Sequence, residues 1–398
     1  MAGSPIVVLD IGASKILCLV GEIHSGDDLR ILGVGSSPCT GLRRSAIIDM
    51  PHVVHSIQQA VGEAERSAGL RITGAYVGIA GEDISAHTSR STVAISGISQ
   101  SIDEEDMARA MASAEQAAPS EGQVSMHRFT QTYWVDGEPV QNPLWLHGNK
   151  LEVETLSIAA SRQATTTLQR AASEGGIEIA GFILESIAAA AAVISQDERE
   201  MGVGILDIGA GTSDLAIFCG PLRHVVEIPF GGDDITHDLS VVLNTSPKIA
   251  EQLKCAYGCV CCSSEEGDEA ISYQNTAGRT FTLTRHQLSS IIEARQQEIL
   301  EFVRGELEAK GFGQILAAGM IFTGGGALLP GLPQLGEDVL GMPVRIGLPQ
   351  DVIAPDSMQD PSYATAIGLL RFAMDERPEV PEREDRLIDK ISRLFSFF

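Results

Sequence analysis

One five-residue motif occurs twice in this sequence, and it constrains the fold more than any other feature. Residues 9–13 and residues 206–210 both read Leu-Asp-Ile-Gly-Ala. Five matching residues between two apolar runs are unexpected by chance, so we predict two halves of one fold, each presenting an acidic turn between two strands. The apolar runs are 6–9 and 16–20 around the first copy, and 203–206 and 215–218 around the second.

The two predicted turns carry the residue types of a phosphate and metal site. Glycine in such a turn lets consecutive backbone N–H groups point into one concavity, which suits phosphate oxygens. Asp10 and Asp207 end strands, where a buried carboxylate is costly unless a cation lies near. If the halves face each other, both carboxylates converge, and Mg²⁺ fits because it needs only one or two of them. A single copy could be a turn aspartate that caps its own backbone. The pair favours a functional site.

Two further glycine clusters are candidates for the same cleft. Residues 322–327, Phe-Thr-Gly-Gly-Gly-Ala, predict a strand that runs into a loop where a flat ligand such as a purine could approach closely. Residues 230–234, Phe-Gly-Gly-Asp-Asp, precede a predicted helix whose N-terminus could lie near phosphates. Glycine clusters are also ordinary in loops, so they support the site without defining it.

Charge and cysteine content exclude several classes of function. The chain has 28 Lys and Arg against 53 Asp and Glu, a net charge of −25, so we expect no nucleic-acid partner. We expect no membrane-spanning helix, because no apolar run reaches about 18 residues, and no signal peptide, because the N-terminus lacks a basic flank and a cleavage site. The cluster Cys255, Cys259, Cys261 and Cys262 lacks the spacing of a zinc site, which favours buried or half-buried free thiols.

The alternation of strands and helices is interrupted between residues 82 and 162. A helix is predicted at 103–118, before Pro119, and strands are predicted at 130–135 and 152–159. This stretch is typical of a small α+β subdomain inserted into the first half.

The end of the sequence combines an apolar stripe with basic charge. A charged segment at 375–386 predicts a linker, and apolar residues then recur at helical spacing beside Lys390 and Arg393. Such a helix suits an anionic bilayer, weakly as a single copy and strongly on a polymer. The alternative is a helix that docks on its own domain or in a partner groove. The stripe is Leu387, Ile388, Ile391, Leu394, Phe395 and Phe398.

These features together resemble the superfamily of actin, sugar kinases and DnaK-type chaperones, and within it the FtsA family of bacterial cell division. The resemblance rests on the two Asp-Ile-Gly turns, the alanine-rich helix after Glu185, Thr-Gly-Gly-Gly at 323–326 and the position of the insertion. It implies an α/β, actin-like ATPase fold. Two related RNase H-like halves would surround a nucleotide cleft, with the small α+β subdomain inserted.

The resemblance also implies how the chain divides into domains. The core of the first half (1A) would be discontinuous, and so would the core of the second half (2A). The expected ranges are 1–81, 163–199 and 351–374 for 1A, 82–162 for the inserted subdomain (1C), 200–245 and 319–350 for 2A, 246–318 for the small subdomain 2B, 375–386 for the linker and 387–398 for a membrane-targeting helix.

The family assigns ATP and Mg²⁺ as cofactors and gives roles to residues. Asp10 and Asp207 would hold Mg²⁺ largely through water, and Glu185 would orient an attacking water in an ATPase that is weak at most. Glu185 could instead be an acidic residue that interacts with the dipole at a helix N-terminus. Glu251 with Lys254 could be only a surface ion pair. The expected nucleotide contacts are Asp10, Gly12, Ser14, Lys15, Asp207, Gly209, Gly211, Thr212, Gly231, Gly232, Glu251, Lys254, Gly324, Gly325 and Gly326.

The implied function is that of a polymerising, ATP-binding actin homologue. It would tether the FtsZ ring to the inner face of the cytoplasmic membrane at the division septum and recruit later division proteins through the inserted subdomain. The FtsZ C-terminal peptide would dock near Arg285, Glu293 and Arg295, unless these residues form only a solvated helix face. Further expected partners are the chain itself, in filaments, and an anionic membrane surface. A small-molecule phosphotransferase resembling a sugar kinase is the alternative, against which the tail and the insertion argue.

Overall fold

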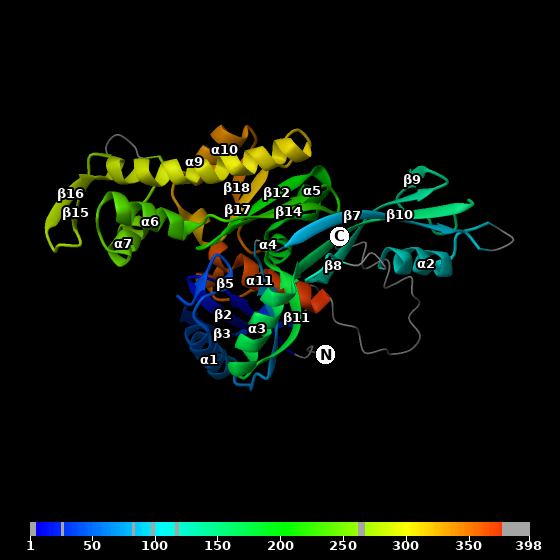
Figure 1. The fold of residues 1–398 in the computed structure, drawn as a ribbon, viewed down its shortest axis with the longest axis horizontal. Helices are drawn as coiled ribbons and strands as arrows, with labels where there is room; N and C mark the ends of the chain where they lie inside the picture. The colour runs from blue at the N-terminus through cyan, green and yellow to red at the C-terminus, as the bar shows by residue number, and fades with distance from the viewer. Residues whose placement is uncertain are drawn as a thin grey trace.

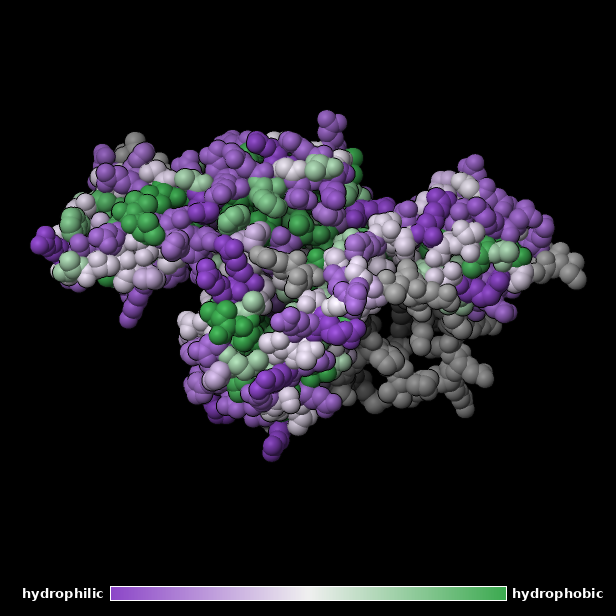
Figure 2. Space-filling view, in the orientation of Figure 1, coloured by the Kyte–Doolittle hydropathy of each residue, from purple (hydrophilic) through white to green (hydrophobic). Residues whose placement is uncertain are grey.

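A computed structural model shows two stacked lobes and a third unit that extends to one side of them (Figure 1). Most of the face in view is hydrophilic, and hydrophobic side chains gather in patches on both stacked lobes (Figure 2). Among the described residues, no helix has the length and apolar character needed to cross a membrane. The structure describes residues 5–24, 28–81, 84–96, 100–115, 119–261 and 267–375.

The first half is built on a six-stranded sheet. Its strands are β1 (Ile6–Ile11), β2 (Lys15–Ile23), β3 (Leu29–Pro38), β6 (Gly74–Ile79), β11 (Glu178–Leu184) and β19 (Val352–Ile353). The first three strands pair antiparallel, and β6 and β11 continue from β1 in parallel. The order is therefore β11-β6-β1-β2-β3-β19. The sequence did not predict β11, because its half-buried, glycine-containing pattern lacks a clear alternation.

Two helices and a short hairpin accompany this sheet. Helix α1 (Met50–Ala68) begins after Asp49, whose side chain accepts a hydrogen bond from the His52 N–H, and ends at Gly69, where φ is 67°. Helix α3 (Arg162–Glu174) follows the insertion. The hairpin of β4 (Leu42–Arg43) and β5 (Ala46–Ile47) lies between β3 and α1 in the chain.

The second half repeats the strand order of the first. Its sheet has the order β14-β13-β12-β17-β18. Strands β12, β13 and β14 pair antiparallel, and β17 and β18 continue from β12 in parallel. The predicted pair of related halves is thereby confirmed. The strands are β12 (Val203–Ile208), β13 (Ser213–Phe218), β14 (Leu222–Ile228), β17 (Met320–Thr323) and β18 (Val344–Ile346), accompanied by α5 (Gln196–Met201), α6 (Gly232–Val242) and α10 (Leu332–Leu340).

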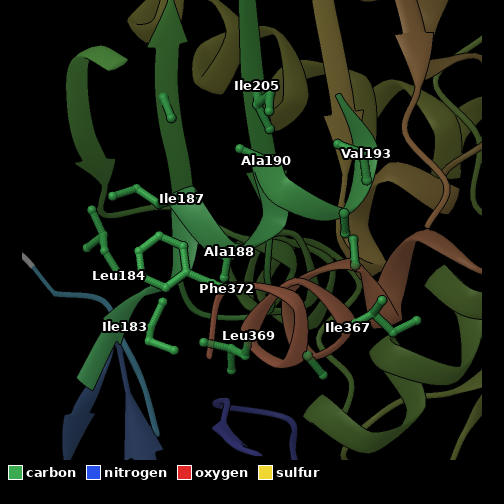
Figure 3. Packing of buried hydrophobic residues seen from close by; sticks show 14 of the residues in the cluster. Ile183, Leu184, Ile187, Ala188, Ala190, Val193, Ile205, Ile367, Leu369 and Phe372 are labelled. Atoms are coloured by element: carbon green, nitrogen blue, oxygen red, sulfur yellow. The ribbon is translucent and has the colours of Figure 1, made fainter. Parts of the chain in front are cut away.

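Two helices cross at the seam between the halves. They are α4 (Glu185–Val193) and α11 (Ala364–Asp375), and their apolar side chains, including Ala188, Leu369 and Phe372, gather in one buried cluster (Figure 3). A Cβ atom on Gly368 would lie 1.7 Å from the carbonyl oxygen of Ala188. Only glycine permits this close crossing, which explains why small residues dominate α4.

The second half also carries an extension, which lies at the opposite end of the molecule from the insertion (Figure 1). It contains helix α7 (Pro247–Tyr257), the hairpin of β15 (Ala270–Gln274) and β16 (Thr280–Thr284), and the long helix α9 (Arg285–Lys310). Helix α7 begins after Ser246, which caps its N-terminus, and α9 begins with a capping box formed by Thr284 and Gln287.

The insertion forms the laterally extended unit of Figure 1. Its sheet has the order β7-β10-β8-β9, and helix α2 covers one face through an apolar cluster that includes Ile102 and Tyr133. The sequence did not predict β7, and it predicted only parts of β8 and β10. The elements are β7 (Ser85–Ala94), α2 (Glu104–Glu115), β8 (Gln123–Val135), β9 (Glu138–Val140) and β10 (Lys150–Ser161).

Strand β8 contacts both halves of the molecule. The ring Nε2 of buried His127 accepts a hydrogen bond of 3.1 Å from the backbone N–H of Leu184, at the end of β11. On the other side, the Gln131 amide donates to the Leu222 carbonyl at 2.9 Å, and Arg223 donates to Gln131 at 3.1 Å. The inserted unit is therefore anchored to the first sheet and to β14 of the second.

Three sequence predictions need correction or lie outside this description. Cys255 and Cys261 are free thiols but exposed, and Cys259 is buried and disulfide-bonded, so buried or half-buried free thiols were the wrong expectation. The helix predicted at 103–118 is described from Glu104 to Glu115. The linker after residue 375 and the membrane-targeting helix at 387–398 lie outside the described residues.

Candidate functional site

The two repeated turns have the same geometry. In the first, between β1 and β2, the N–H of Gly12 donates to the Lys15 carbonyl at 3.1 Å. In the second, between β12 and β13, the N–H of Gly209 donates to the Thr212 carbonyl at 2.9 Å. Asp10 and Asp207 are each the penultimate residue of the preceding strand. The sequence repeat thus produces matching turns with a carboxylate at the same position.

The glycine-rich loop packs against the second turn. Strand β17 ends at Thr323, and Gly324 follows with φ 81°. A Cβ atom on Gly324 would lie 2.2 Å from Oδ1 of Asp207, so a side chain here would displace the carboxylate. The N–H of Gly232, at the start of α6, donates to the Gly209 carbonyl at 3.0 Å. These contacts hold the glycine-rich loop and the α6 N-terminus around Asp207.

A cavity of about 610 Å³ joins the turns of both halves. Gly231 is the one predicted nucleotide contact that does not line it; this residue caps α6 instead. Ser362, Thr365 and Asp214 line the cavity although the sequence did not single them out. The predicted residues in its lining are Asp10, Gly12, Ser14, Lys15, Glu185, Asp207, Gly209, Gly211, Thr212, Gly232, Glu251, Lys254, Gly324, Gly325 and Gly326.

Several buried carboxyl groups at this cavity have raised pKa values, because burial disfavours their charged forms. Burial raises the pKa of Asp10 to about 6, which nearby Lys15 opposes and the charge of Asp207 reinforces. Burial also raises the pKa of Asp207, although the Thr365 hydroxyl, which donates to its Oδ2, opposes the shift. Burial raises the pKa of Glu185 well above its ordinary value, and the charge of Asp10 adds to that. A bound cation would relieve each of these costs.

Two acidic residues behind the second turn were not anticipated from the sequence. Asp214 on β13 lies opposite Asp207 on β12 and opposite Glu227 on β14. Burial raises the pKa of Asp214 well above its ordinary value, and the charges of Glu227 and Asp207 raise it further. Strand register alone brings these carboxylates together, so no local pattern in the sequence could have revealed the row.

Lys15 connects the first turn to the segment that enters α11. Its Nζ donates to the Ser362 carbonyl at 3.3 Å and lies 4.5 Å from the centre of the Tyr363 ring. The lysine therefore lies between the first turn and the seam helix, within the cavity lining.

Glu251 and Lys254 form an ion pair and also line the cavity. Their charged atoms are 2.7 Å apart on successive turns of α7. The Lys254 Nζ donates to the Gly232 carbonyl at 2.8 Å and to the Thr236 hydroxyl at 2.9 Å. The two interpretations left open by the sequence, ion pair and cleft residue, are compatible in this geometry.

The three predicted partner-docking residues lie on α9 and have different neighbours in the chain. Arg295 donates to Asp238 of α6 at 2.7 and 3.0 Å. Glu293 lies near Cys261, whose pKa is raised by burial and then by the charge of Glu293. Arg285 donates to the Tyr257 carbonyl at 3.1 Å and reaches the cavity lining. Both guanidinium groups are thus held by neighbours in the same chain.

Comparison with protein-family models gives two matches. Residues 204–368 match the model described as cell division protein FtsA, and residues 81–159 match the SHS2 domain inserted in FtsA. The second match falls on the inserted unit built around the β7-β10-β8-β9 sheet.

Curated relatives cover almost the whole chain. The cell division protein FtsA of Pseudomonas aeruginosa is 34% identical over 382 residues, 95% of this chain and 91% of that protein. That of Bacillus subtilis is 36% identical over 370 residues, 92% of this chain and 83% of that protein. That of Escherichia coli K12 is 32% identical, over 93% of this chain and 90% of that protein.

Solved structures confirm the fold class. The PilM-PilN type IV pilus biogenesis complex aligns with a TM-score of 0.65 at 19% identity, covering 94% of this chain and 99% of that one. MreB5 of Spiroplasma citri bound to ADP aligns with a TM-score of 0.58 at 15% identity and the same coverage. The chain therefore has an actin-like α/β fold.

Proposed function

Because the chain belongs to the FtsA family of cell-division proteins, we propose that it binds ATP with Mg²⁺ between its halves, polymerises, and tethers the FtsZ ring to the membrane. The observation that carries this proposal is the convergence of Asp10 and Asp207 on one cavity from two matching turns. The domain limits inferred from the resemblance, with the insertion at 82–162, belong to the same proposal.

The residues at the turns fit a divalent cation bound with a triphosphate. The pKa values of Asp10 and Asp207 are raised mainly because burial disfavours the charged carboxylates, a cost that a divalent cation beside them would offset. No three His, Cys, Asp or Glu side chains of the described chain are arranged to hold a metal alone, so water and phosphate oxygens would complete its shell. When bound, Mg²⁺ would neutralise part of the phosphate charge.

The chain's own groups would bind and orient the phosphates. Backbone N–H groups of the glycine turns and the hydroxyls of Ser14 and Thr212 are donors at the cavity wall, and Lys15 adds a positive charge. Glu185, whose raised pKa favours holding a proton, would orient a water for hydrolysis. The protein need supply no covalent nucleophile, because positioning and charge do most of the work in phosphoryl transfer, and we expect weak turnover at most.

Attachment to the membrane is proposed from the sequence of residues 387–398. Six apolar residues recur there at the spacing of one helical stripe, beside basic residues, in a strongly acidic chain. Folding so short a helix consumes much of the gain from burial, so one copy binds reversibly and a polymer binds by avidity. The protein would then act at the inner face of the cytoplasmic membrane at the septum.

The proposed protein partners are FtsZ and later division proteins. The FtsZ C-terminal peptide is proposed to dock near Arg285, Glu293 and Arg295 of α9, and the later proteins on the inserted subdomain. Because Arg295 is paired with Asp238, a peptide carboxylate would have to compete with Asp238 for it.

Liposome co-sedimentation tests the coupling of nucleotide, polymer and membrane. The full chain is compared with a chain ending at Asp385, each with and without ATP and Mg²⁺, on vesicles containing anionic lipid. Truncation should abolish pelleting while leaving nucleotide binding intact. Pelleting of the truncated chain would refute the membrane role of the tail.

An acceptor screen tests the alternative function. ADP release from ATP is measured with a panel of sugars, beside a reaction without sugar. Release that depends on an acceptor would favour a phosphotransferase and refute the cytoskeletal proposal.

A further inference from the structure

Gln296 is a fully buried residue whose side-chain amide has no hydrogen-bond partner among the residues that the structure describes. It lies on α9 between the buried residues Ile292 and Ile299, with 0% of its surface exposed. Neither Nε2 nor Oε1 has a hydrogen-bond partner among the described residues. Buried polar groups are nearly always paired, since an unpaired one loses its bonds to water without replacement.

The same residue belongs to the lining of the cleft cavity. The cavity wall formed by α7 and α9 includes Gln296 with Glu251 and Lys254. Residues 328–330, Leu-Leu-Pro, face the same cavity. This wall is distinct from the two aspartate turns, which suit phosphates and a cation. It offers the apolar residues 328–330, one amide and the Glu251–Lys254 ion pair, which together suit a flat heterocyclic base with polar edges.

We propose that Gln296 recognises the base of the bound nucleotide and selects adenine, an inference that rests on the proposed binding of ATP. The amide oxygen accepts from the exocyclic amino group, and the amide nitrogen donates to the adjacent ring nitrogen, which is the pairing that glutamine makes with adenine edges in nucleic acids. Because the amide atoms are covered in this structure, pairing requires rotation of the Gln296 side chain toward the base.

Guanine does not match this pairing at the equivalent edge. Its carbonyl oxygen replaces the amino group beside N7, so two acceptors face the amide instead of one donor and one acceptor. A site built to hydrogen-bond a ligand rejects analogues that leave its buried polar groups unpaired. We therefore expect the cleft to prefer ATP over GTP by about tenfold or more.

The test combines a change in the protein with a change in the ligand. The full chain, Gln296→Leu and Gln297→Leu are titrated with ATP, GTP and purine riboside triphosphate, which lacks the amino group, all with Mg²⁺. Gln297 is exposed on the same helix and its amide donates to Glu301, so its variant is the matched control.

The unaltered chain and the Gln297 variant should prefer ATP over the other two triphosphates by about tenfold. Gln296→Leu should bind ATP and purine riboside triphosphate with equal affinity. The two deletions are expected to be non-additive because both remove the hydrogen bond to the amino group, and the variant loses the bond to the ring nitrogen as well. Equal affinities of the unaltered chain for ATP and purine riboside triphosphate would overturn the inference without any variant.

Thermal unfolding separates recognition from a structural role. Replacing an unpaired buried amide by an apolar group of similar size should leave the midpoint of the nucleotide-free chain unchanged or higher. The rise in midpoint on adding ATP should shrink. A lower midpoint without nucleotide, together with unchanged selectivity, would mean that Gln296 is structural and would refute the inference.

The two proposals fail in different ways. If the unaltered chain binds none of the three triphosphates, the proposed function is wrong. If it binds ATP and Gln296→Leu retains the same selectivity, the function stands and the role of Gln296 is wrong.

Discussion

The close crossing of α4 and α11 predicts opposite effects for two glycine-to-alanine substitutions. In Gly368→Ala, the added Cβ would lie 1.7 Å from the Ala188 carbonyl oxygen. Ordinary carbon–oxygen contact needs about 3.3 Å, so the helices must separate by more than 1 Å. In Gly305→Ala, in the last third of α9 but inside the helix, the added Cβ meets nothing within 4 Å.

The energetic expectation differs in sign between the two sites. Overpacking at Gly368 should lower the free energy of unfolding by about 1–3 kcal/mol or more, because the added Cβ meets the backbone of Ala188, which cannot rotate away as a side chain can. Alanine at Gly305 should stabilise the chain by about 0.5–1 kcal/mol, because glycine is the poorer helix former. With a shift of about 2–4 °C per kcal/mol, Gly368→Ala should unfold several degrees lower and Gly305→Ala slightly higher.

The assay is thermal unfolding followed by circular dichroism, without nucleotide and at one protein concentration. ATP affinity serves as a second readout, because Thr365 on α11 donates to Asp207 at the site. Gly368→Ala should lose affinity and Gly305→Ala should keep it. An unfolding midpoint for Gly368→Ala at or above that of the unaltered chain would refute the packing argument.

Three other predictions follow from the charged groups. Asp207→Ala should lower ATP affinity at least about tenfold with Mg²⁺ and hardly at all in EDTA, as measured by calorimetric titration; unchanged affinity with Mg²⁺ would point to a different site. Because the folded-state pKa of Asp10 is raised from 3.8 to about 6, the folded chain binds the extra proton. Without metal, the free energy of unfolding should therefore rise by about 1 kcal/mol between pH 7 and pH 5, and urea titrations of Asp10→Asn should lose this gain. The ion pair of Arg295 with Asp238 should show a coupling of about 1–2 kcal/mol in a double-mutant cycle of stability, and no coupling would mean that the pair is only a surface contact.

Local patterns made much of the fold predictable. The repeated turns are short, identical in sequence and bounded by strands, so their geometry follows from neighbouring residues. The same holds for α1, which ends at the left-handed Gly69, and for the hairpin turn at Asp136 and Gly137, where both φ values are positive. Gly324, Gly325 and Gly326 line the same cavity as the two turns.

Features that depend on tertiary contacts escaped prediction. Asp214 and Glu227 meet only through the register of β13 and β14. Gln296 lies in the polar run Arg-Gln-Gln-Glu at 295–298, which looks like a solvated helix face until α9 is packed against its neighbours. The pairing of Arg295 with Asp238 likewise depends on how α6 and α9 pack.

The anchorage of β8 ties the insertion to the motion of the whole molecule. His127 holds it to the strand end that precedes Glu185, while Gln131 holds it to the opposite sheet. If the halves rotate apart, one of these bonds must break or the insertion must swing with them. A ligand that fixes the interlobe angle therefore also fixes the pose of the insertion, and a protein that grips the insertion restrains how far the lobes can part.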